Sequence, residues 1–114
     1  MYKKGEVWYA KFPLEDDSSL YIERPVLIAD VIDNEIVVIK VTKHEPREYD
    51  MYDVPIQYWK AAGLSYSSTA RISKVVLLNE TLMLNKKGEL QVSDFNNIFD
   101  KLNSFLRLKH LVNS

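Results

Sequence analysis

Alternating hydrophobic and polar positions run through most of the chain before its last segment, and they predict β-strands. The strongest pattern lies between Glu23 and Glu45. There, residues 25–32 form a nearly continuous apolar stretch, as expected for a strand covered on both faces. Residues 36–42 alternate instead, and their even positions change from apolar to polar as the segment approaches Thr42. We expect these two strands to form a hairpin whose open end presents polar side chains.

The register of this hairpin decides whether Arg24 and Thr42 lie on one face, because side chains alternate along a strand with a period of two. With a strict two-residue turn at positions 33–34, the two side chains project to opposite faces. With a three-residue turn at positions 33–35, one of its residues in the left-handed region, Arg24 opposes His44 and all three side chains project together. We predict this second register, or a β-bulge with the same effect.

Four more segments have the strand pattern, and a long polar loop separates the first of them from the hairpin. The loop covers residues 14–23, is rich in acidic residues and exceeds most hairpin connections in length. The predicted strands are residues 5–12, 51–56, 69–78 and 81–84. Pro55 places the second of these at an edge or an end, and we expect the third to bend or split near Lys74. A turn is predicted at residues 87–88.

Helical signals mark two further segments. Residues 57–62 predict one or two helical turns closed by Gly63. From Ser93 onward apolar residues recur at helical spacing, with Ser93 as the candidate cap and Asp94 at the positive end of the helix dipole. The predicted architecture is a mainly β, α+β fold: a small antiparallel β-barrel or curled sheet with a short helix, closed by a C-terminal α-helix. We assign residues 1–114 to one domain.

Composition narrows the classes of function. The chain has 114 residues, no cysteine and a formal net charge of −1. The lack of cysteine removes disulfides, thiolate metal sites and a cysteine nucleophile, and it fits a reducing, cytoplasmic compartment. No apolar stretch has the length of a signal peptide or a membrane span, so we expect a mature protein with no membrane partner. Any nucleic-acid site must be a local basic patch, for which the candidates are Lys40, Lys43, Arg47, Lys60, Arg71 and Lys74.

Several short motifs follow one another in an order that resembles a known family. The first three are Gly-Glu-Val-Trp at residues 5–8, Arg-Pro-Val-Leu at residues 24–27 and Val-Thr at residues 41–42. The later ones are Gly63-Leu64, Ser68, Arg71-Ile72-Ser73-Lys74 and Gly88-Glu89-Leu90, followed by the final helix. Together they resemble the MazF/PemK-like toxins of bacterial toxin–antitoxin systems. The match covers most of the chain.

This resemblance implies an SH3-like barrel that is usually a homodimer and that cleaves single-stranded RNA at short sequences. It implies no metal and no other cofactor, and it implies a cognate antitoxin that silences the enzyme. It also carries over Arg24 and Thr42 as the catalytic residues, because they stand at the matching positions. The loop at residues 14–23 departs from the family's common version, since it contains no glycine.

Metal-independent cleavage would use the neighbouring ribose 2′-hydroxyl as nucleophile. The planar guanidinium of Arg24 suits the developing charge on phosphorus, because it can hold two phosphoryl oxygens and stays charged. The hydroxyl of Thr42 can position a phosphate through one hydrogen bond. His44 is a third candidate, since an imidazole exchanges protons near neutral pH, although a solvated loop histidine explains it somewhat better.

Four more residues are candidates for RNA binding. They are Lys43, Ser68, Arg71 and Lys74. For Arg71 a cross-strand ion pair is an equally good explanation, and for Ser68 a hydroxyl that stabilises a turn. Tyr58 and Trp59 could stack on a base, but anchoring of the short helix to the core explains them better.

Two other classes of function remain open on the sequence. One is a non-enzymatic toxin like CcdB, which shares the fold and binds DNA gyrase through its C-terminal helix. The apolar residues late in the final helix, Leu106, Leu108, Leu111 and Val112, would then form a partner surface. The other is a barrel that serves only as an interaction module.

Overall fold

The structure is a computed structural model that describes the backbone of residues 1–113 and the side chains of residues 1–110. One antiparallel sheet contains six strands in the order β4-β5-β3-β2-β1-β6. The strands are β1 (Glu6–Pro13), β2 (Tyr21–Ile32), β3 (Glu35–Thr42), β4 (Asp53–Ile56), β5 (Ser68–Asn79) and β6 (Met83–Glu89). A short 3₁₀ helix, η1 (Glu80–Leu82), precedes β6, and the chain continues into α1 (Val92–Asn113). The predicted class, mainly β with a C-terminal helix, is confirmed.

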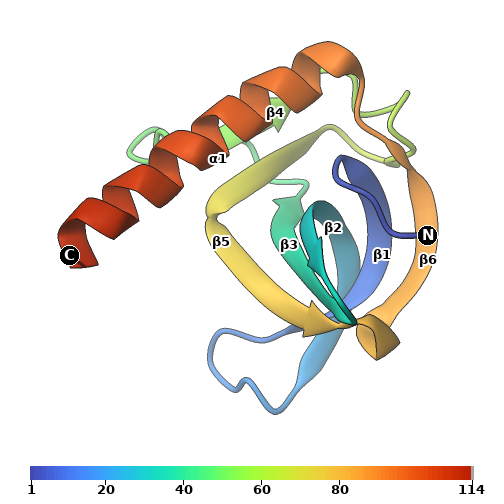
Figure 1. Cartoon of the computed structure of the whole chain (residues 1–114). Coiled ribbons are helices and arrows are strands. Elements are labelled where there is room, and N and C mark those ends of the chain that lie inside the picture. Colours follow the sequence, from blue (N-terminus) through green and yellow to red (C-terminus); the bar gives the residue numbers. More distant parts are fainter. Residues whose placement is uncertain (114) are drawn as a thin grey trace.

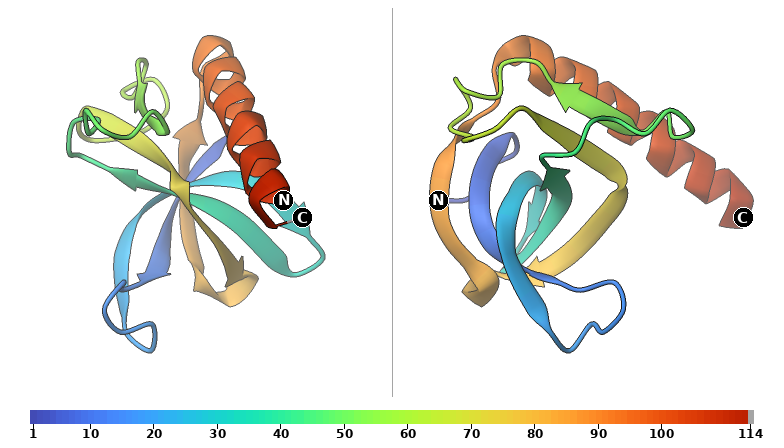
Figure 2. Two further views of the ribbon diagram at one scale, coloured as in Figure 1. Left: turned by 90° about the vertical axis from the view of Figure 1, so that its left-hand side faces the viewer. Right: turned by 180° about the vertical axis from the view of Figure 1, so that it is seen from behind.

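The sheet is strongly curled (Figures 1 and 2). Strands β5 and β6 pair with β3 and β1, on opposite sides of β2, yet only the three residues of η1 join them. The sheet must therefore bend until these two strands approach each other. No ladder joins the edge strands β4 and β6 among residues 1–113, so of the two predicted forms, a small barrel or a curled sheet, the chain forms the curled sheet. The position of β4 at an edge agrees with Pro55, which cannot donate to a ladder.

Two apolar clusters hold the fold together, one on each face of the curl. The concave face buries side chains from β1, β2 and β3, chiefly Ala10, Phe12, Val26, Ile28, Ile36 and Val38. The convex face packs against α1, which lies across β5 (Figure 1). Ile98 and Leu102 of α1 are buried there at helical spacing, beside Val7, Leu27, Ile39, Val41, Ile56 and Ile72. Every central strand therefore buries both faces, which explains the nearly continuous apolar run of β2.

In the hairpin of β2 and β3, Arg24 and Thr42 share a face as predicted, but because of a bulge and not of a three-residue turn. Its turn has two residues, since Ile32 pairs with Glu35, and Asp33 takes the left-handed region with φ 56°. A bulge at Ala29 then shifts the register, so that Val26 opposes Lys40. The three-residue turn and the pairing of Arg24 with His44 were wrong. The alternative prediction of a bulge with the same effect is confirmed, because Val26 lies opposite Lys40 and the two-residue alternation along each strand then places Arg24 and Thr42 on one face.

Strand β5 bends where it was expected to bend. Ile39 pairs with Val75 but its neighbour Lys40 pairs with Arg71, so residues 72–74 form a bulge. The predicted turn at residues 87–88 was wrong, because both residues lie within β6 and Gly88 pairs with Val7.

The predicted short helix at residues 57–62 was also wrong, because this segment is a succession of turns. It contains one helical hydrogen bond, from Ala62 N to Tyr58 O, too little for a regular helix. The buried carboxylate of Asp94 instead holds the segment, accepting bonds from Gln57 N and Tyr58 N at 3.0 and 2.8 Å. Asp94 therefore connects the first turn of α1 to the segment that directly follows β4. Helix α1 begins at Val92, so Ser93 lies inside the first turn rather than before it.

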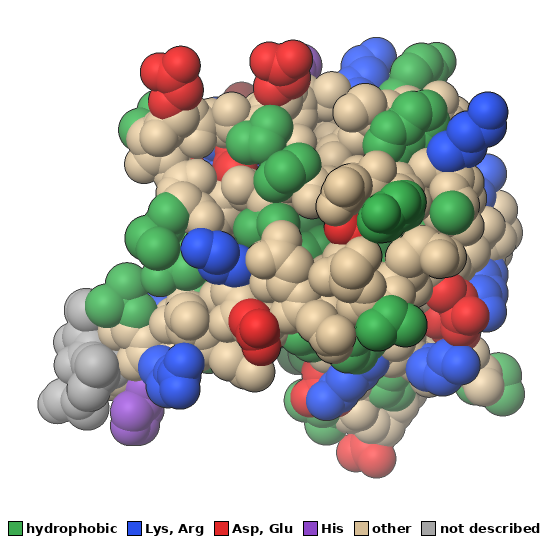
Figure 3. All heavy atoms as spheres, turned by 90° about the horizontal axis from the view of Figure 1, so that it is seen from above, with side chains coloured by type: hydrophobic (Ala, Val, Ile, Leu, Met, Phe, Trp, Pro, Cys, Tyr) green, Lys and Arg blue, Asp and Glu red, His purple; other side chains and the backbone are tan. Residues whose placement is uncertain are grey.

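Figure 3 views the molecule from the side of α1 and shows acidic and basic side chains interspersed over this face. No helix in the described part of the chain is long and apolar enough to cross a membrane.

Candidate active site

The open end of the β2–β3 hairpin leads into a cavity of about 410 Å³. Its walls come from β1, β2, β3, β5, β6 and the turns after β4. The lining residues that the sequence had singled out are Arg24, Thr42, Lys43, His44 and Ser68. Arg71 and Lys74 are not part of this lining. Five of the seven predicted site residues thus share one cavity, although they come from β2, from β5 and from the end of β3 with the corner that follows it.

Arg24 enters the cavity from β2 as a half-buried cation. Its Nε is buried and has no hydrogen-bond partner among the described residues. Its guanidinium carbon lies 6.0 Å from the centre of the Phe12 ring. Burial lowers the pKa of Arg24, and the nearby positive charge of Arg71 lowers it further, although a guanidinium stays protonated in proteins. An unpaired, partly desolvated cation of this kind stabilises an anion that enters the cavity.

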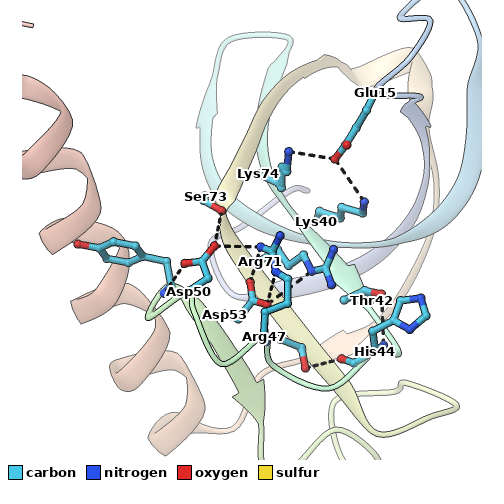
Figure 4. A network of polar contacts seen from close by, with 12 residues as sticks. Glu15, Lys40, Thr42, His44, Arg47, Asp50, Asp53, Arg71, Ser73 and Lys74 are labelled. Atoms are coloured by element: carbon cyan, nitrogen blue, oxygen red, sulfur yellow. Dashed lines mark hydrogen bonds and ion pairs between the residues drawn. The ribbon is translucent and has the colours of Figure 1, made fainter.

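Thr42 ends β3 and is 6% exposed. Its Oγ1 accepts a hydrogen bond from the backbone N–H of His44 at 3.3 Å. Thr69 Oγ1 donates to the His44 carbonyl at 2.8 Å, so the corner at residues 42–44 is held from both sides. The Thr42 oxygen is occupied as an acceptor in this arrangement, while its hydroxyl hydrogen can still donate to a ligand. The exposed imidazole of His44 projects away from the neighbouring polar network (Figure 4).

Lys43 and Ser68 both contact the turn that carries Tyr66. Ser68 Oγ donates to the Tyr66 carbonyl at 2.6 Å, which is the turn-stabilising role considered for it. Lys43 Nζ lies 5.4 Å from the centre of the Tyr66 ring. Tyr66 is 64% exposed and lines the cavity, so it presents an aromatic face beside the cations.

The sequence had predicted no site residue on the other side of this cavity. It is formed by Tyr9 of β1 and Lys87 of β6, whose Nζ lies 5.2 Å from the Tyr9 ring centre, together with the turn at residues 63–66. Gly63 (φ 91°) holds that turn against β6, since a Cβ there would collide with the Lys87 carbonyl. Alternation in β1 had placed Tyr9 on the face opposite Trp8, but only the curl of the sheet brings it to the cavity.

A dense ion-pair network holds the loop that follows His44 (Figure 4). Arg47 Nε and Nη2 bond the two carboxylate oxygens of Asp53 at 2.8 and 2.9 Å, and Arg47 N bonds Asp53 at 2.9 Å. Nη2 also bonds Asp50 at 2.9 Å. The hydrogen bonds from Arg47 lower the pKa of Asp53, whose side chain is fully buried. We call Arg47, Asp50 and Asp53 the loop network.

Arg71 and Lys74 lie on β5, next to this cavity rather than in its lining. Arg71 of β5 lies opposite Asp53 of β4 in the sheet, and Arg71 Nε is 3.7 Å from Asp53 Oδ2. This contact is the cross-strand ion pair that the sequence allowed, but it is long, and Arg71 Nε has no hydrogen-bond partner among the described residues. Lys74 Nζ lies 3.0 Å from Glu15 Oε1, in the loop between β1 and β2.

No group of three or more His, Asp or Glu side chains within residues 1–110 has an arrangement that would hold a metal ion. Trp59 packs against the convex apolar cluster, as expected, and does not line the cavity.

Comparison with known proteins identifies a family and several solved structures of the same fold. Residues 3–106 match the family model of the PemK-like, MazF-like toxin of type II toxin–antitoxin systems. An endoribonuclease in complex with its cognate antitoxin, from a mycobacterial species, superposes with a TM-score of 0.71 at 17% identity, covering 95% of this chain and 97% of that one. MazF from Deinococcus radiodurans gives 0.71 at 14% identity, with coverage of 92% and 96%.

The MazE–MazF complex from Deinococcus radiodurans gives a TM-score of 0.68 at 14% identity, with coverage of 92% and 95%. At these identities the solved structures establish a shared fold. No curated protein matches the chain.

Proposed function

The chain belongs to the PemK-like, MazF-like toxins of type II toxin–antitoxin systems, and from this premise we propose that it is an endoribonuclease that cleaves single-stranded RNA in the cavity at the open end of the β2–β3 hairpin. The observation that carries the proposal is the meeting of Arg24 and Thr42 in one cavity, with Arg24 Nε buried and without a hydrogen-bond partner in residues 1–110. A buried guanidinium nitrogen without a hydrogen-bond partner is costly unless a ligand supplies the missing acceptor.

The proposed reaction starts with attack of the ribose 2′-hydroxyl oxygen on the adjacent phosphorus. A bond forms between phosphorus and O2′, the bond to O5′ breaks, and the products carry a 2′,3′-cyclic phosphate and a 5′-hydroxyl. The proton leaves O2′ and one is delivered to O5′. Arg24 holds the non-bridging oxygens, where negative charge develops, and so stabilises the transition state more than the substrate. No step draws on a metal ion.

Thr42 and His44 have different parts in this proposal. Thr42 donates its hydroxyl hydrogen to the scissile phosphate and so orients it, because the Thr42 oxygen already accepts from His44 N. His44 follows on an exposed corner at the cavity and is the candidate for moving a proton between the reacting oxygens and water.

Preference for particular bases would come from the aromatic walls. Tyr66 and Tyr9 stand at the cavity with Lys43 and Lys87 beside their rings. A base next to the scissile phosphate can stack on such a ring, while the lysines attract the flanking phosphates. Ser68 supports this wall through its bond to the Tyr66 carbonyl.

The protein partner in this proposal is a cognate antitoxin that blocks the cavity, and the active form in the cytoplasm is a homodimer. Family membership supports the antitoxin, and two of the structurally similar proteins are described in complex with one.

The decisive experiment incubates the purified protein with a long single-stranded RNA in the presence of a chelator. Cleavage products with 5′-hydroxyl ends are expected from the wild type, and Arg24→Ala and Thr42→Ala should lose most of the activity. Arg107→Ala and Thr81→Ala are matched controls, because both residues are exposed and neither lines the cavity. Intact RNA with the wild type across a range of salt would refute the proposal, and equal cleavage by all variants would move the site elsewhere.

A further inference from the structure

Four basic side chains gather on the concave face of the curled sheet, and three of them lie beyond the lining of the cavity. Lys40 of β3 lies directly opposite Arg71 of β5, and alternation places Lys40 on the same face as Thr42. Lys74 lies on β5 within the bulge. We call Arg24, Lys40, Arg71 and Lys74 the concave cation cluster.

Lys40 is the least accessible lysine of this cluster, since its side chain is 14% exposed. Burial lowers the pKa of Lys40, and the charge of Arg24 lowers it further. Burial and then the charge of Arg71 act on the pKa of Arg24 in the same direction. The cations therefore repel one another, and they are close enough for this repulsion to be felt.

The carboxylates near the cluster do not balance it. Asp53 contacts Arg71 only at 3.7 Å and is bonded mainly by Arg47. The remaining carboxylate is Glu15, whose Oε1 lies 3.0 Å from Lys74 Nζ and 3.8 Å from Lys40 Nζ (Figure 4). The cluster thus keeps an excess of positive charge, which attracts an anion.

Glu15 contacts the cluster from an exposed loop. Its side chain is 58% exposed, against 39% for Lys74. The loop is closed by a bond from Leu14 N to the Leu20 carbonyl and turned by bonds from Ser19 to Asp17, so Glu15 is presented on a defined hairpin end. Ion pairs at such exposure are weak, and a phosphate with more charge and more acceptor oxygens can displace the carboxylate.

Geometry relates this position to the cavity. Lys40 precedes Thr42 by two residues on one strand face, which separates their Cα atoms by about 6.6 Å. This spacing is comparable to the separation of consecutive phosphates in an extended single strand. A strand with one phosphate at Arg24 and Thr42 can therefore place a neighbouring phosphate at Lys40 and Lys74.

We propose that Lys40 and Lys74 form a second phosphate site for single-stranded RNA, and that the carboxylate of Glu15 occupies this site until RNA displaces it. The identity of the anion rests on the proposed RNA cleavage. Glu15 then reduces RNA affinity, and Lys74 raises it. The site would add affinity and fix the direction in which the strand crosses the cavity.

The test measures binding without cleavage, with a fluorescent ten-nucleotide 2′-O-methyl RNA that has no 2′-hydroxyl to react. Glu15→Gln should raise affinity about three- to fivefold at low salt, the range for release of an exposed ion pair. Lys74→Ala should lower affinity and reduce the slope of log K against log salt by about 0.7, the loss of one phosphate contact.

The chain offers closely matched controls on β6. Glu89 is 49% exposed and contacts two lysines at 3.2 and 3.8 Å, much as Glu15 does. Lys86 is 44% exposed and contacts Glu6 at 3.0 Å, as Lys74 contacts Glu15. Glu89→Gln and Lys86→Ala should leave both affinity and slope at wild-type values. Lys74, with 39% of its side chain exposed, is preferred for the test to Lys40, with 14% exposed, since its removal disturbs the packing less.

The outcomes separate this inference from the proposed activity. If Glu15→Gln and Lys74→Ala behave like their controls, the second phosphate site is overturned, even where the wild type cleaves RNA. If they shift binding as expected while the wild type leaves RNA intact, the site stands and the catalytic proposal fails. A decaglutamate peptide provides the last arm. Variants that change its binding and not that of RNA would assign the lysines to an acidic protein and overturn the inference.

Discussion

The loop network and the concave cation cluster lie on neighbouring strands, and their charges are matched in opposite ways. In the loop network, the guanidinium of Arg47 donates hydrogen bonds to Asp53 and Asp50 at 2.8 to 2.9 Å. In the concave cation cluster, Arg24 Nε and Arg71 Nε are buried without a hydrogen-bond partner among the described residues. The first arrangement stabilises the fold, whereas the second keeps binding capacity for a ligand.

This difference shows why the identity of a residue does not reveal its task. Arg47 and Arg24 are both arginines beside the open end of one hairpin, but only Arg47 finds a buried carboxylate within reach. A buried charge that is fully paired contributes to the stability of the loop after His44. A buried charge that is left unpaired lowers stability and marks a functional site.

The largest expected effect is on stability, from Asp53→Asn. The substitution keeps the shape of the side chain but removes the charge that holds Arg47, so the free energy of unfolding should fall by about 3 kcal/mol. Urea unfolding measures this change, and Asp100→Asn on the exposed side of α1 is the control. A loss below about 1 kcal/mol would mean that the loop network is no more than a surface ion pair.

Arg24→Ala should have the opposite effect to Asp53→Asn, with a large loss of activity and little loss of stability. We expect kcat/KM for RNA cleavage to fall about 10²- to 10³-fold, because one donor group to the developing charge is lost. The free energy of unfolding should not fall by more than about 1 kcal/mol, since Arg24 Nε has no internal partner and Arg71 repels the charge. Arg24→Lys should lie between the two in activity, because an ammonium cannot hold two oxygens in parallel. A large loss of stability in Arg24→Ala would place Arg24 with the structural charges.

Thr42 has a structural hydrogen bond from His44 N and a proposed contact with the phosphate, and two substitutions separate these roles. Thr42→Val keeps the branched shape, loses the bond from His44 N and should cost about 1 kcal/mol of stability and at least tenfold in activity. Thr42→Ser restores the hydroxyl and should retain most of the activity. Thermal unfolding and initial cleavage rates measure the two effects. Equal activity of both variants would remove the hydroxyl from the mechanism.

The smallest expected effect is a pH dependence of the loop network. The hydrogen bonds of Arg47 lower the pKa of Asp53 in the folded state. A carboxyl with a lowered folded-state pKa stabilises the fold above its unfolded pKa, about 3.9, and that stability is lost as pH falls through the folded pKa. The difference in unfolding free energy between wild type and Asp53→Asn should therefore be constant above about pH 5 and shrink below about pH 4. A difference that stays unchanged at pH 3 would contradict this assignment.

Local patterns were sufficient for most elements of the fold. Alternation located β1, β2, β3 and β5 within a few residues, because each strand buries side chains at every second position or on both faces. Helical spacing located α1 for the same reason, as Ile98 and Leu102 meet the convex face. The segment at residues 57–63 was misjudged because the bonds that hold it come from Asp94, far along the chain.

The shared face of Arg24 and Thr42 was a requirement that local sequence signals could not resolve. A turn at Asp33 and Asn34 fits two residues as well as three, and nothing local indicates that Ala29 forms a bulge. That choice depends on pairing with β1 and β5, on both sides of the hairpin, and on the packing of both apolar clusters. Five of the candidate residues meet in one cavity, and this meeting is a result of the whole sheet.

The amino-acid pattern was enough to indicate the strands, the long helix and the residue types suited to phosphate chemistry, because each of these depends on neighbours within a few positions. Only the folded chain decided which charges are paired. Asp53 reaches Arg47 through the return of β4 to the sheet, and Glu15 reaches Lys40 and Lys74 through the curl. Electrostatic interactions depend on distance and on burial, and both are set by contacts between segments far apart in sequence.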